Sequence, residues 1–521
     1  MFDLHKLAFV TVVVVVGYAL SRSRRVDPRE PPAVSGSIPL ISHLIGFCSH
    51  GGEYFSILAK KHDHPIFSIN LILTRIYIVT SPALLQSMQR NSQTLSLDPF
   101  ITYTTPRHAG IHGESLELLR EKRTGGQGLN QTVMHAMRQT LTGKSLHVMN
   151  QRMAALLTPF VDELLHSGGE VVDLYDWVIR AVIAASTDAS YGPLNPYKDR
   201  RVVDAFRTLD SHLLLTYLDF LPAFIRRKPT KARETLAAAL LKYFRANGHT
   251  QGSELTRVRY ETLVRGGLAL PDIARHEAAM AIGLLSNTAP AAFWVTFNIF
   301  SRPELLRQIR DEVQRSALRF REDETHVIDL QSLKSACPLL LSTYQESLRG
   351  SSAFATRVAT ADTVLGGRYL VRGGCLVGAP SGAMGAHADV WGVGLGSSSP
   401  SPSPSADGDD EFDPRRFIKT PGYNPRRTGG LMTFGVSPIL CPGRHFATAE
   451  ILALVAMLVL RVDIEPVGTD GSRRWVKPKT NGMATASITG PVQGGFHVRV
   501  WDREGYNCVP PLDRYGYSEY A

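Results

Sequence analysis

The feature that most constrains the fold is a long apolar segment that begins near Pro271–Asp272 and ends before Pro303. A proline and an acidic residue are typical of the first turn of a helix. Roughly 30 residues at a rise of about 1.5 Å each predict a helix about 45 Å long. A helix of that length crosses a whole domain, so the remaining elements must pack around it.

The rest of the chain is predicted to be mainly α-helical with small β-sheets. From about Glu114 to Glu312 apolar residues recur at helical spacing, and a helix is predicted over 171–184. β-Branched residues over 66–79 predict two short strands, and strand-like segments return at 356–378 and 484–500. No alternating series of strands and helices indicates a doubly wound sheet.

The N-terminus has the pattern of a membrane anchor. Leu7 to Leu20 contain no charged residue, and three arginines follow closely. The run is shorter than the roughly 20 residues that span a bilayer, so a cleaved signal peptide is the alternative. No small-residue cleavage site follows, and the arginines place the rest of the chain on the cytosolic side. We therefore predict a single transmembrane helix over 1–25, a proline-rich hinge over 26–46, and a globular domain over 47–521 with a low-complexity surface insert over 396–410.

Charge and cysteine content narrow the partners and the compartment. Among 521 residues, Lys and Arg number 57 and Asp and Glu number 47, which gives a net charge of +10. This excess suits an anionic surface such as the cytoplasmic face of a membrane. No zinc-finger spacing or RNA-binding aromatic signature favours nucleic acid. The five cysteines are widely scattered, so we expect no disulfide framework and a reducing compartment.

One cysteine lies in a loop whose composition favours a bound thiolate. Residues 434–447 read FGVSPILCPGRHFA, and a helix is expected to begin near Arg444. Cys441 would then lie beside a helix N-terminus, whose partial positive charge favours the anion. The flanking prolines and glycine can form a turn whose N–H groups point at the sulfur. The alternative is a small buried apolar residue.

This segment resembles the haem-binding loop of the cytochrome P450 family. Phe434, Gly435, Cys441 and Gly443 stand at the spacings of that loop. The resemblance implies the P450 fold and haem b as the cofactor, with Cys441 as the axial ligand of the haem iron and the other three as cofactor-binding positions. It covers about residue 30 to the C-terminus. The anchor and the hinge are similar to those of microsomal members.

Three further motifs occur in the family's order. YQESLR supplies Glu346 and Arg349 about one helical turn apart. HADVWG occupies 387–392, and FDPRRF supplies Arg416. The resemblance implies that this glutamate and the two arginines form one structural cluster. An isolated E-x-x-R is common on surface helices, but four motifs in order are specific.

Two departures from the family's pattern concern the haem propionates. Ser437 replaces a glycine four residues before the cysteine, and Ile439 replaces a basic residue. The resemblance therefore assigns the propionates to other cations, which are Arg357 after the E-x-x-R helix and Arg138 in the region where a W-x-x-x-R motif is absent. His135 lies in the same region as Arg138, and a solvated helix face is the alternative for both.

The long helix contains the segment in which the family activates oxygen, here GLLSNTAPAAFW over 283–294. The family usually has an acid followed by threonine, and the resemblance assigns Asn287 and Thr288 as the catalytic pair of this chain. Pro290 removes one helical hydrogen bond and predicts a kink that exposes the carbonyl of Ser286. The alternative is an ordinary helix break. The string resembles the branch of sterol 7α-hydroxylases and prostacyclin synthase.

The resemblance implies a membrane-anchored monooxygenase that oxidises a lipophilic small molecule, such as a terpenoid, a steroid or another secondary metabolite. Electrons are expected from NADPH through a separate cytochrome P450 reductase, because no dinucleotide fingerprint is visible. The expected location is the endoplasmic reticulum membrane. Substrate contacts are assigned to Phe100 and Tyr103 in a loop-rich lid, and to Leu284 and Phe354.

Alternatives from other classes stay open. The branch is chemically mixed, so one is a haem isomerase or dehydratase that needs no external electrons. Others are a non-catalytic haem or lipid-binding membrane protein and, more distantly, a nucleic-acid binder. The apolar segment from Leu213 to Ile225 precedes three basic residues. It predicts either a core helix or a substrate entrance that dips into the bilayer.

Overall fold

The structure is a computed structural model. It describes residues 27–36, 41–71, 74–120, 128–166, 169–217, 221–320, 326–350, 353–387, 412–419, 431–468, 470–480, 486–492 and 494–503. The anchor predicted over 1–25 and the insert predicted over 396–410 lie outside these residues. The chain divides into two compact units: unit 1 comprises Met1–Phe100, Gly350–Ser403 and Arg427–Leu440, and unit 2 comprises Ile101–Arg349, Pro404–Arg426 and Cys441–Ala521.

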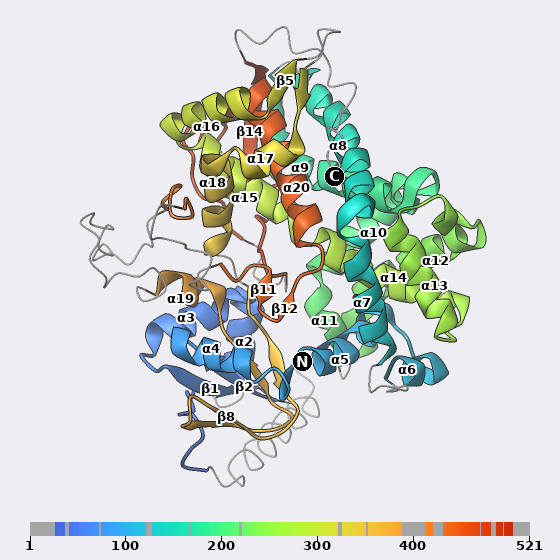
Figure 1. Ribbon diagram of the computed structural model, residues 1–521, viewed down its shortest axis with the longest axis vertical. Coiled ribbons are helices and arrows are strands. Elements are labelled where there is room, and N and C mark those ends of the chain that lie inside the picture. Colours follow the sequence, from blue (N-terminus) through green and yellow to red (C-terminus); the bar gives the residue numbers. More distant parts are fainter. Residues whose placement is uncertain are drawn as a thin grey trace, which may run out of the picture. The chain divides into compact units, whose positions relative to one another are not determined.

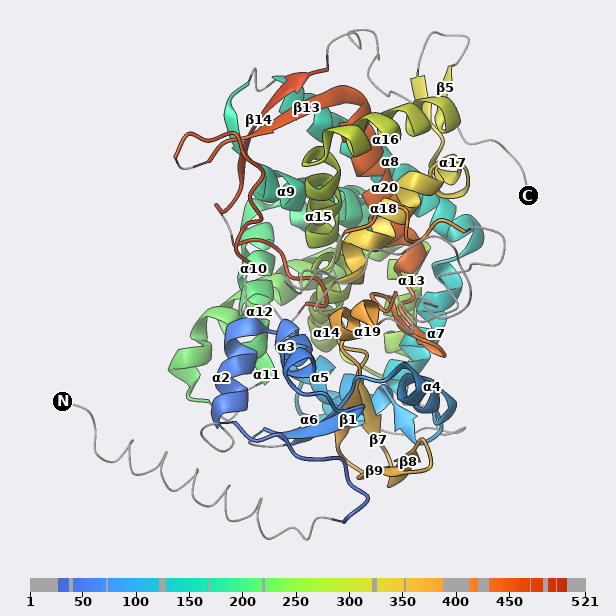
Figure 2. The ribbon, with the colours of Figure 1, turned by 90° about the vertical axis from the view of Figure 1, so that its left-hand side faces the viewer.

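Unit 1 is built on a mixed five-stranded sheet of order β1-β2-β10-β7-β3. Its strands are β1 (Ile66–Asn70), β2 (Arg75–Val79), β3 (Leu95–Ser96), β7 (Arg357–Ala359) and β10 (Leu376–Gly378). The β2–β10 pair is parallel and the other pairs are antiparallel. The two strands predicted over 66–79 are therefore confirmed as β1 and β2, and Figure 2 shows β1 and β7 in this unit.

Both faces of this sheet are buried. Successive side chains of a strand point to opposite faces, and both sets belong to apolar clusters. On β2, Tyr77 and Val79 belong to one apolar cluster, whereas Ile76 and Ile78 belong to another. The other elements of unit 1 are α2 (Ile41–His50), α3 (Glu53–Lys61), α4 (Pro82–Arg90), α19 (Ser381–Ala386), the β8 (Thr363–Leu365)–β9 (Tyr369–Val371) hairpin and the β11 (Gly435–Val436)–β12 (Ile439–Leu440) hairpin.

Unit 2 is mainly helical. Its helices are α5 (Asp98–Ala109, from residue 101 on), α6 (Gly113–Arg120), α7 (Leu129–Thr140), α8 (Gly143–His166), α9 (Leu174–Tyr191), α10 (Arg200–Ser211), α11 (Leu213–Tyr217), α12 (Ala223–Arg245), α13 (Glu254–Arg265), α14 (Leu270–Leu285), α15 (Thr288–Phe300), α16 (Pro303–Ser316), α17 (Leu330–Ser335), α18 (Pro338–Arg349) and α20 (Arg444–Arg461). Its sheets are β5 (Leu318–Phe320)–β6 (His326–Ile328) and the three-stranded β4 (Val171–Asp173), β14 (His497–Asp502) and β13 (Val462–Pro466). The prediction of a mainly α-helical chain with small sheets is confirmed.

The core of unit 2 lies around α20. Every residue from Ile451 to Leu460 is buried, so this helix is apolar on all sides because all of its sides are covered. It packs against α15 and α18, which lie beside it in both ribbon views (Figures 1 and 2), and against α8. The helix start predicted near Arg444 is confirmed.

The predicted long helix is two helices. α14 ends at Leu285 and α15 begins at Thr288, with Ser286 and Asn287 in a turn between them. Pro290 lies in the first turn of α15, where a missing N–H costs no intrahelical bond. The proline therefore places the break three to four residues before itself. The predicted interruption of the helix is confirmed. The prediction of one continuous helix is wrong.

Two local predictions were wrong for identifiable reasons. Val171 and Val172 form strand β4 and pair with β14, rather than starting a helix. Asp173 ends the strand and caps α9, because its carboxylate accepts the N–H groups of Tyr175 and Asp176 at 3.0 and 3.1 Å. The segment expected to be a loop around Phe100 is helix α5.

The helical segment Leu270–Phe300 is the one stretch of the described residues that is long and apolar enough to cross a membrane. The share of its apolar part that is buried inside the protein is 61%. That burial fits a core helix of unit 2. The predicted N-terminal anchor lies outside the described residues, so this finding does not concern it.

A buried acid in α20 predicts how stability depends on pH. The Glu450 carboxyl is fully buried and accepts only the Ser186 hydroxyl, at 2.8 Å from each oxygen. Burial raises its pKa from the ordinary 4.5 to about 8. The folded protein therefore keeps a proton that the unfolded chain releases, so stability falls as pH rises from the unfolded to the folded pKa.

We expect Glu450→Gln to stabilise the protein more at about pH 7.5 than at about pH 5.5, by up to about 1.4 kcal/mol per pH unit between the two pKa values. Thermal unfolding of both proteins at both pH values measures this difference. Glu170→Gln, at an exposed position, is the control and should show no such pH dependence. An equal effect of Glu450→Gln at both pH values would contradict the assignment.

Candidate active site

A hairpin leads directly to the cysteine loop. β11 pairs with β12 in the register Gly435↔Leu440 and Val436↔Ile439. Gly435 has a φ of +85°, and a Cβ there would lie 2.8 Å from the Ile439 carbonyl oxygen. Only glycine adopts this conformation without strain or collision. The chain therefore leaves β12 in a fixed direction, and Cys441 is the next residue.

Cys441 is an exposed residue at the end of this loop. Burial of the surrounding loop raises its pKa, whereas the backbone N–H groups of Gly443 and Arg444 and the Arg444 charge act in the opposite direction. A Cβ at Gly443 would lie 3.9 Å from the sulfur, which is an ordinary contact distance. A cysteine sulfur with N–H donors at a helix start suits a metal ion that stabilises the thiolate.

A buried arginine without a carboxylate partner lies in unit 1. Three arginines are buried among the described residues, and two of them, Arg259 and Arg349, face a glutamate. Arg357 is 5% exposed and donates only to the carbonyls of Thr356 and Val436, at 2.8 and 3.0 Å. Burial lowers its pKa to about 10. Such a cation suits an anionic group of a bound cofactor.

The E-x-x-R residues form the expected cluster in unit 2. Arg349 binds both carboxylate oxygens of Glu346 at 2.8 and 2.9 Å, and Arg416 adds a third bond at 3.1 Å. The backbone N–H of Asp413 is a fourth donor, at 3.1 Å. The Glu346 side chain is fully buried, so the two arginines neutralise a charge that water does not reach.

Each of the three residues at the break between α14 and α15 has a different partner. Ser286 donates its hydroxyl to the Asp210 carboxylate. Asn287 accepts the backbone N–H of Ile488 at 3.2 Å. The Thr288 hydroxyl reaches only the Leu284 carbonyl, at 3.5 Å, which is the limit of a hydrogen bond. Of the three side chains, the threonine therefore has the weakest hydrogen bond.

One face of α14 near the break is open. Gly283 is exposed and Leu284 is half-buried, and a Cβ at Gly283 would meet nothing within 4 Å. An open face in the last turn of a core helix has room for a bound molecule. Asn287, one turn further along, is also half-buried.

Known proteins match this chain over most of its length. The family model for cytochrome P450 matches residues 31–485. The chain belongs to the cytochrome P450 family. The cytochrome P450 monooxygenase nodJ of Hypoxylon pulicicidum is 37% identical over 92% of this chain and 91% of its own length. The cholesterol 7-alpha-monooxygenase of Cricetulus griseus is 25% identical over 85% and 88%.

The fold is also that of a solved structure. A crystal structure of a cytochrome P450 (CYP102L1) superimposes with a TM-score of 0.66 over 92% of this chain and 100% of that chain, at 18% identity. The family match and the monooxygenases among its relatives show that the chain is a cytochrome P450 monooxygenase. Membership of the family implies a haem-iron cofactor, electrons from a reductase and a small-molecule substrate. In unit 2, the Cys441 thiol is a suitable ligand for the iron of this cofactor. In unit 1, the buried Arg357 suits a propionate.

The other predicted site residues are placed differently. Arg138 and His135 are exposed on α7. The Tyr103 ring is 44% exposed and is covered by the Arg107 guanidinium at 3.6 Å. Phe354 stacks on Phe55 at 4.3 Å within the apolar cluster of unit 1. Phe100 and Phe434 are half-buried, and the roles of all these residues stay predictions.

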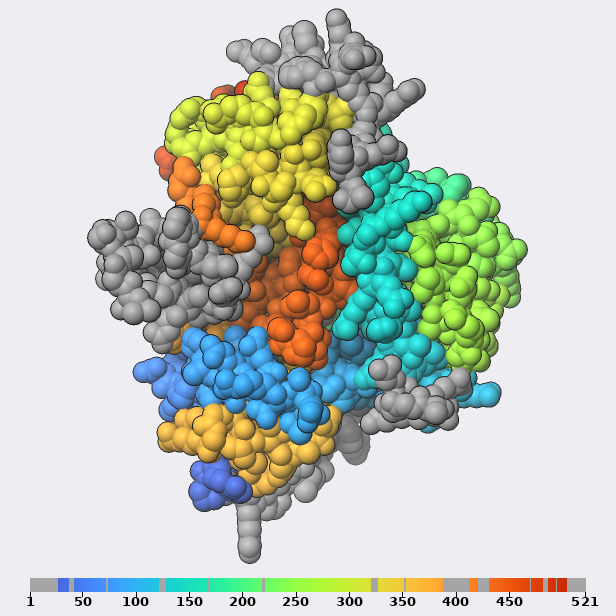
Figure 3. All heavy atoms as spheres, in the orientation of Figure 1, coloured from blue at the N-terminus to red at the C-terminus, as the bar shows by residue number. Residues whose placement is uncertain are grey.

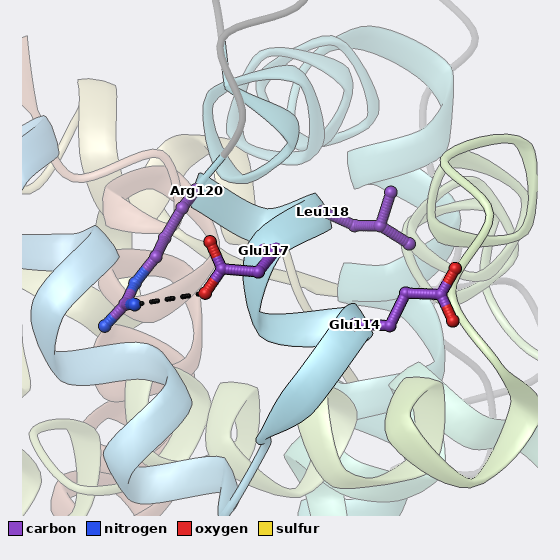
Figure 4. A pocket seen from close by; sticks show the side chains of 4 residues that line it. All are labelled: Glu114, Glu117, Leu118 and Arg120. Carbon is purple, nitrogen blue, oxygen red and sulfur yellow. Dashed lines mark hydrogen bonds and ion pairs between the residues drawn. The ribbon is translucent and has the colours of Figure 1, made fainter.

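The surface pocket in Figure 4 is no substitute for this P450 site. Its volume is about 320 Å³, and its lining comes from the single helix α6. Glu117 and Arg120 pair across it at 3.4 Å, while Glu114 and Leu118 point to the other side (Figure 4). Its charged lining is unlike the apolar chamber that a lipophilic ligand requires.

The buried cluster of Glu346 predicts a large loss of stability on neutralisation. Glu346→Gln removes the charge that Arg349 and Arg416 share, and leaves two poorly hydrated cations. We expect a loss of about 3–5 kcal/mol in the free energy of unfolding, measured by urea denaturation. The control is Glu304→Gln on the surface of α16, where the carboxylate pairs with Arg307 in solvent. Equal effects of the two substitutions would contradict the role of Glu346.

Proposed function

We propose that this P450 is a membrane-anchored monooxygenase of the endoplasmic reticulum that hydroxylates a lipophilic terpenoid, steroid or similar secondary metabolite. NADPH supplies the electrons through a cytochrome P450 reductase. The observation that carries the proposal is the place of Cys441 in the chain, directly after a glycine-dependent hairpin and three residues before the start of α20. In this proposal the Cys441 thiolate would hold the iron of haem b.

The cofactor and the chain contribute different parts of the chemistry. Haem with a thiolate ligand favours cleavage of the O–O bond when it is bound. Phe434, Gly435 and Gly443 shape the loop around the sulfur. The buried guanidinium of Arg357 binds a propionate, and Arg138 on the surface of α7 is a second donor for the other. A propionate paired with Arg357 would also remove the free-energy cost of burying an unpaired cation there.

The residues at the helix break handle polar groups on the substrate side. Thr288 has only a bond of 3.5 Å to the Leu284 carbonyl, so its hydroxyl can turn to a water molecule or to bound dioxygen. The Asn287 amide has no acidic proton to transfer, and its oxygen accepts the backbone N–H of Ile488. We therefore propose that Thr288 contacts oxygen. Asn287 instead positions the 486–490 segment by accepting the N–H of Ile488.

The proposed substrate is lipophilic for two reasons. One relative is, by its name, a cholesterol 7-alpha-monooxygenase. The start of α12 exposes apolar side chains to solvent, with Phe224 76% and Ile225 41% exposed, directly before three basic residues. Exposed apolar residues beside cations suit an anionic lipid surface from which such a substrate enters. Phe100, Tyr103, Leu284 and Phe354 are the proposed substrate contacts.

Replacement of Cys441 tests the proposed ligand directly. The reduced wild-type enzyme with carbon monoxide should show the red-shifted Soret band of a thiolate-ligated haem, and Cys441→Ala should lose it, because no other sulfur takes its place. Cys48→Ala, which changes a half-buried free cysteine of α2, is the matched control and should keep the band. A red-shifted band in Cys441→Ala would contradict the assignment.

Turnover distinguishes oxygen insertion from the alternative chemistry. With a P450 reductase, NADPH and a panel of steroids and terpenoids, we expect product formation to consume dioxygen and NADPH in step with the substrate. Incorporation of one atom of labelled dioxygen into the product is the measurement. A product formed without NADPH and dioxygen would overturn the proposal in favour of a haem isomerase or dehydratase.

A further inference from the structure

A carboxyl group from another helix contacts the break between α14 and α15, which has no acidic residue of its own. Position 287, the usual place of an acid before Thr288, is an asparagine. The Asp210 carboxylate at the end of α10 instead accepts the Ser286 hydroxyl at 2.5 Å. Asp210 and Ser286 are 76 residues apart in the chain. The carboxyl group thus reaches the break through space rather than along the helix.

The surroundings of Asp210 favour a carboxyl group that gains and loses a proton near neutral pH. Burial raises its pKa from 3.8 to about 6, and the Ser286 hydrogen bond only partly opposes this. The Tyr175 phenol of α9 faces it and stays protonated. Arg207, one turn earlier on α10, binds Asp176 at 2.6 Å. Among the described residues, no cation forms a salt bridge with Asp210.

Ser286 is placed to connect this carboxyl group with the break. Ser286 is 4% exposed, whereas Asp210 is half-buried. The Ser286 carbonyl lacks the helical donor four residues on, because Pro290 has no N–H. Asn287 is not an alternative acid, because an amide cannot supply a proton.

We propose that Asp210 supplies protons to the oxygen-activation segment through Ser286. Insertion of one oxygen atom from dioxygen into a C–H bond consumes two electrons and two protons, and the second oxygen atom leaves as water. In the protonated state the Asp210 carboxyl gives its proton to the Ser286 oxygen, which reverses the hydrogen bond of the carboxylate form, while the Ser286 hydroxyl proton passes to a water molecule at the break. That water molecule gives one of its own protons to the oxygen atom that leaves as water. Bulk water then reprotonates the carboxylate. The proposal rests on monooxygenase activity.

The rival explanation is that the Asp210–Ser286 bond only fastens α10 to the end of α14. Asp210→Asn distinguishes the two explanations. Its amide oxygen still accepts the Ser286 hydroxyl, but the side chain no longer carries a transferable proton. Ser286→Ala removes the connection and keeps the acid, and Ser286→Thr restores a hydroxyl. Asp204→Asn, on the exposed side of the same helix, is the matched control.

The test uses the full-length holoenzyme with its reductase and a turned-over substrate. All variants should keep the carbon monoxide band and bind substrate as the wild type does. For Asp210→Asn and Ser286→Ala, product per NADPH should fall by about tenfold, and the lost electrons should appear as hydrogen peroxide. Ser286→Thr should recover coupling. Wild-type turnover should fall as pH rises through about 6, and Asp210→Asn should lack that dependence.

A readout without turnover completes the test. Infrared difference spectra of the resting holoenzyme between low and neutral pH should contain a carboxylic acid band that Asp210→Asn removes and Asp204→Asn keeps. Unchanged coupling and pH profile in Asp210→Asn, or a band that persists in it, would overturn the role of Asp210. Loss of the carbon monoxide band in the wild type would instead contradict the proposed haem ligation.

Discussion

The position of one sulfur atom is the constraint on which the rest of the site depends. The β11–β12 hairpin fixes the chain just before Cys441, because Gly435 has a conformation and a close approach that a Cβ would not allow. α20 fixes it from Arg444 on, because the later turns of that helix are fully buried. Between these two anchors the loop is short, so the thiol has little freedom to leave the position in which backbone N–H groups meet it.

Buried charge explains why the supporting residues are arranged as they are. Glu346 brings a full negative charge into the interior of unit 2, and two arginines and a backbone N–H meet it there. Arg259 and Glu277 form another buried pair, to which the Tyr191 hydroxyl donates at 3.0 Å. Arg357 differs from both groups because its charge is buried against carbonyls alone. In our proposal, an anionic group of the cofactor would neutralise this charge.

Features with a local cause were predictable from the sequence. The E-x-x-R pair follows from helical spacing, β1 and β2 from β-branched residues, and the start of α20 from the Gly-rich loop before it. A largely apolar segment of roughly 30 residues predicted one helix with a kink before Pro290, whereas the structure has a turn at Ser286 and Asn287 that ends one helix and starts another. β4 was missed because Val171 and Val172 also fit a helical pattern, and their partner β14 is more than 300 residues away. The contact of Asp210 with Ser286 and that of Ile488 with Asn287 left no local signal at all.

The central claim is that Cys441 ligates the haem iron, and X-ray absorption at the iron edge of the purified holoenzyme tests it most directly. We expect one sulfur neighbour of iron in the wild type and its replacement by a lighter atom in Cys441→Ser, with the haem nitrogens unchanged in both proteins. A sulfur neighbour that persists in Cys441→Ser, or an iron without a sulfur neighbour in the wild type, would contradict it.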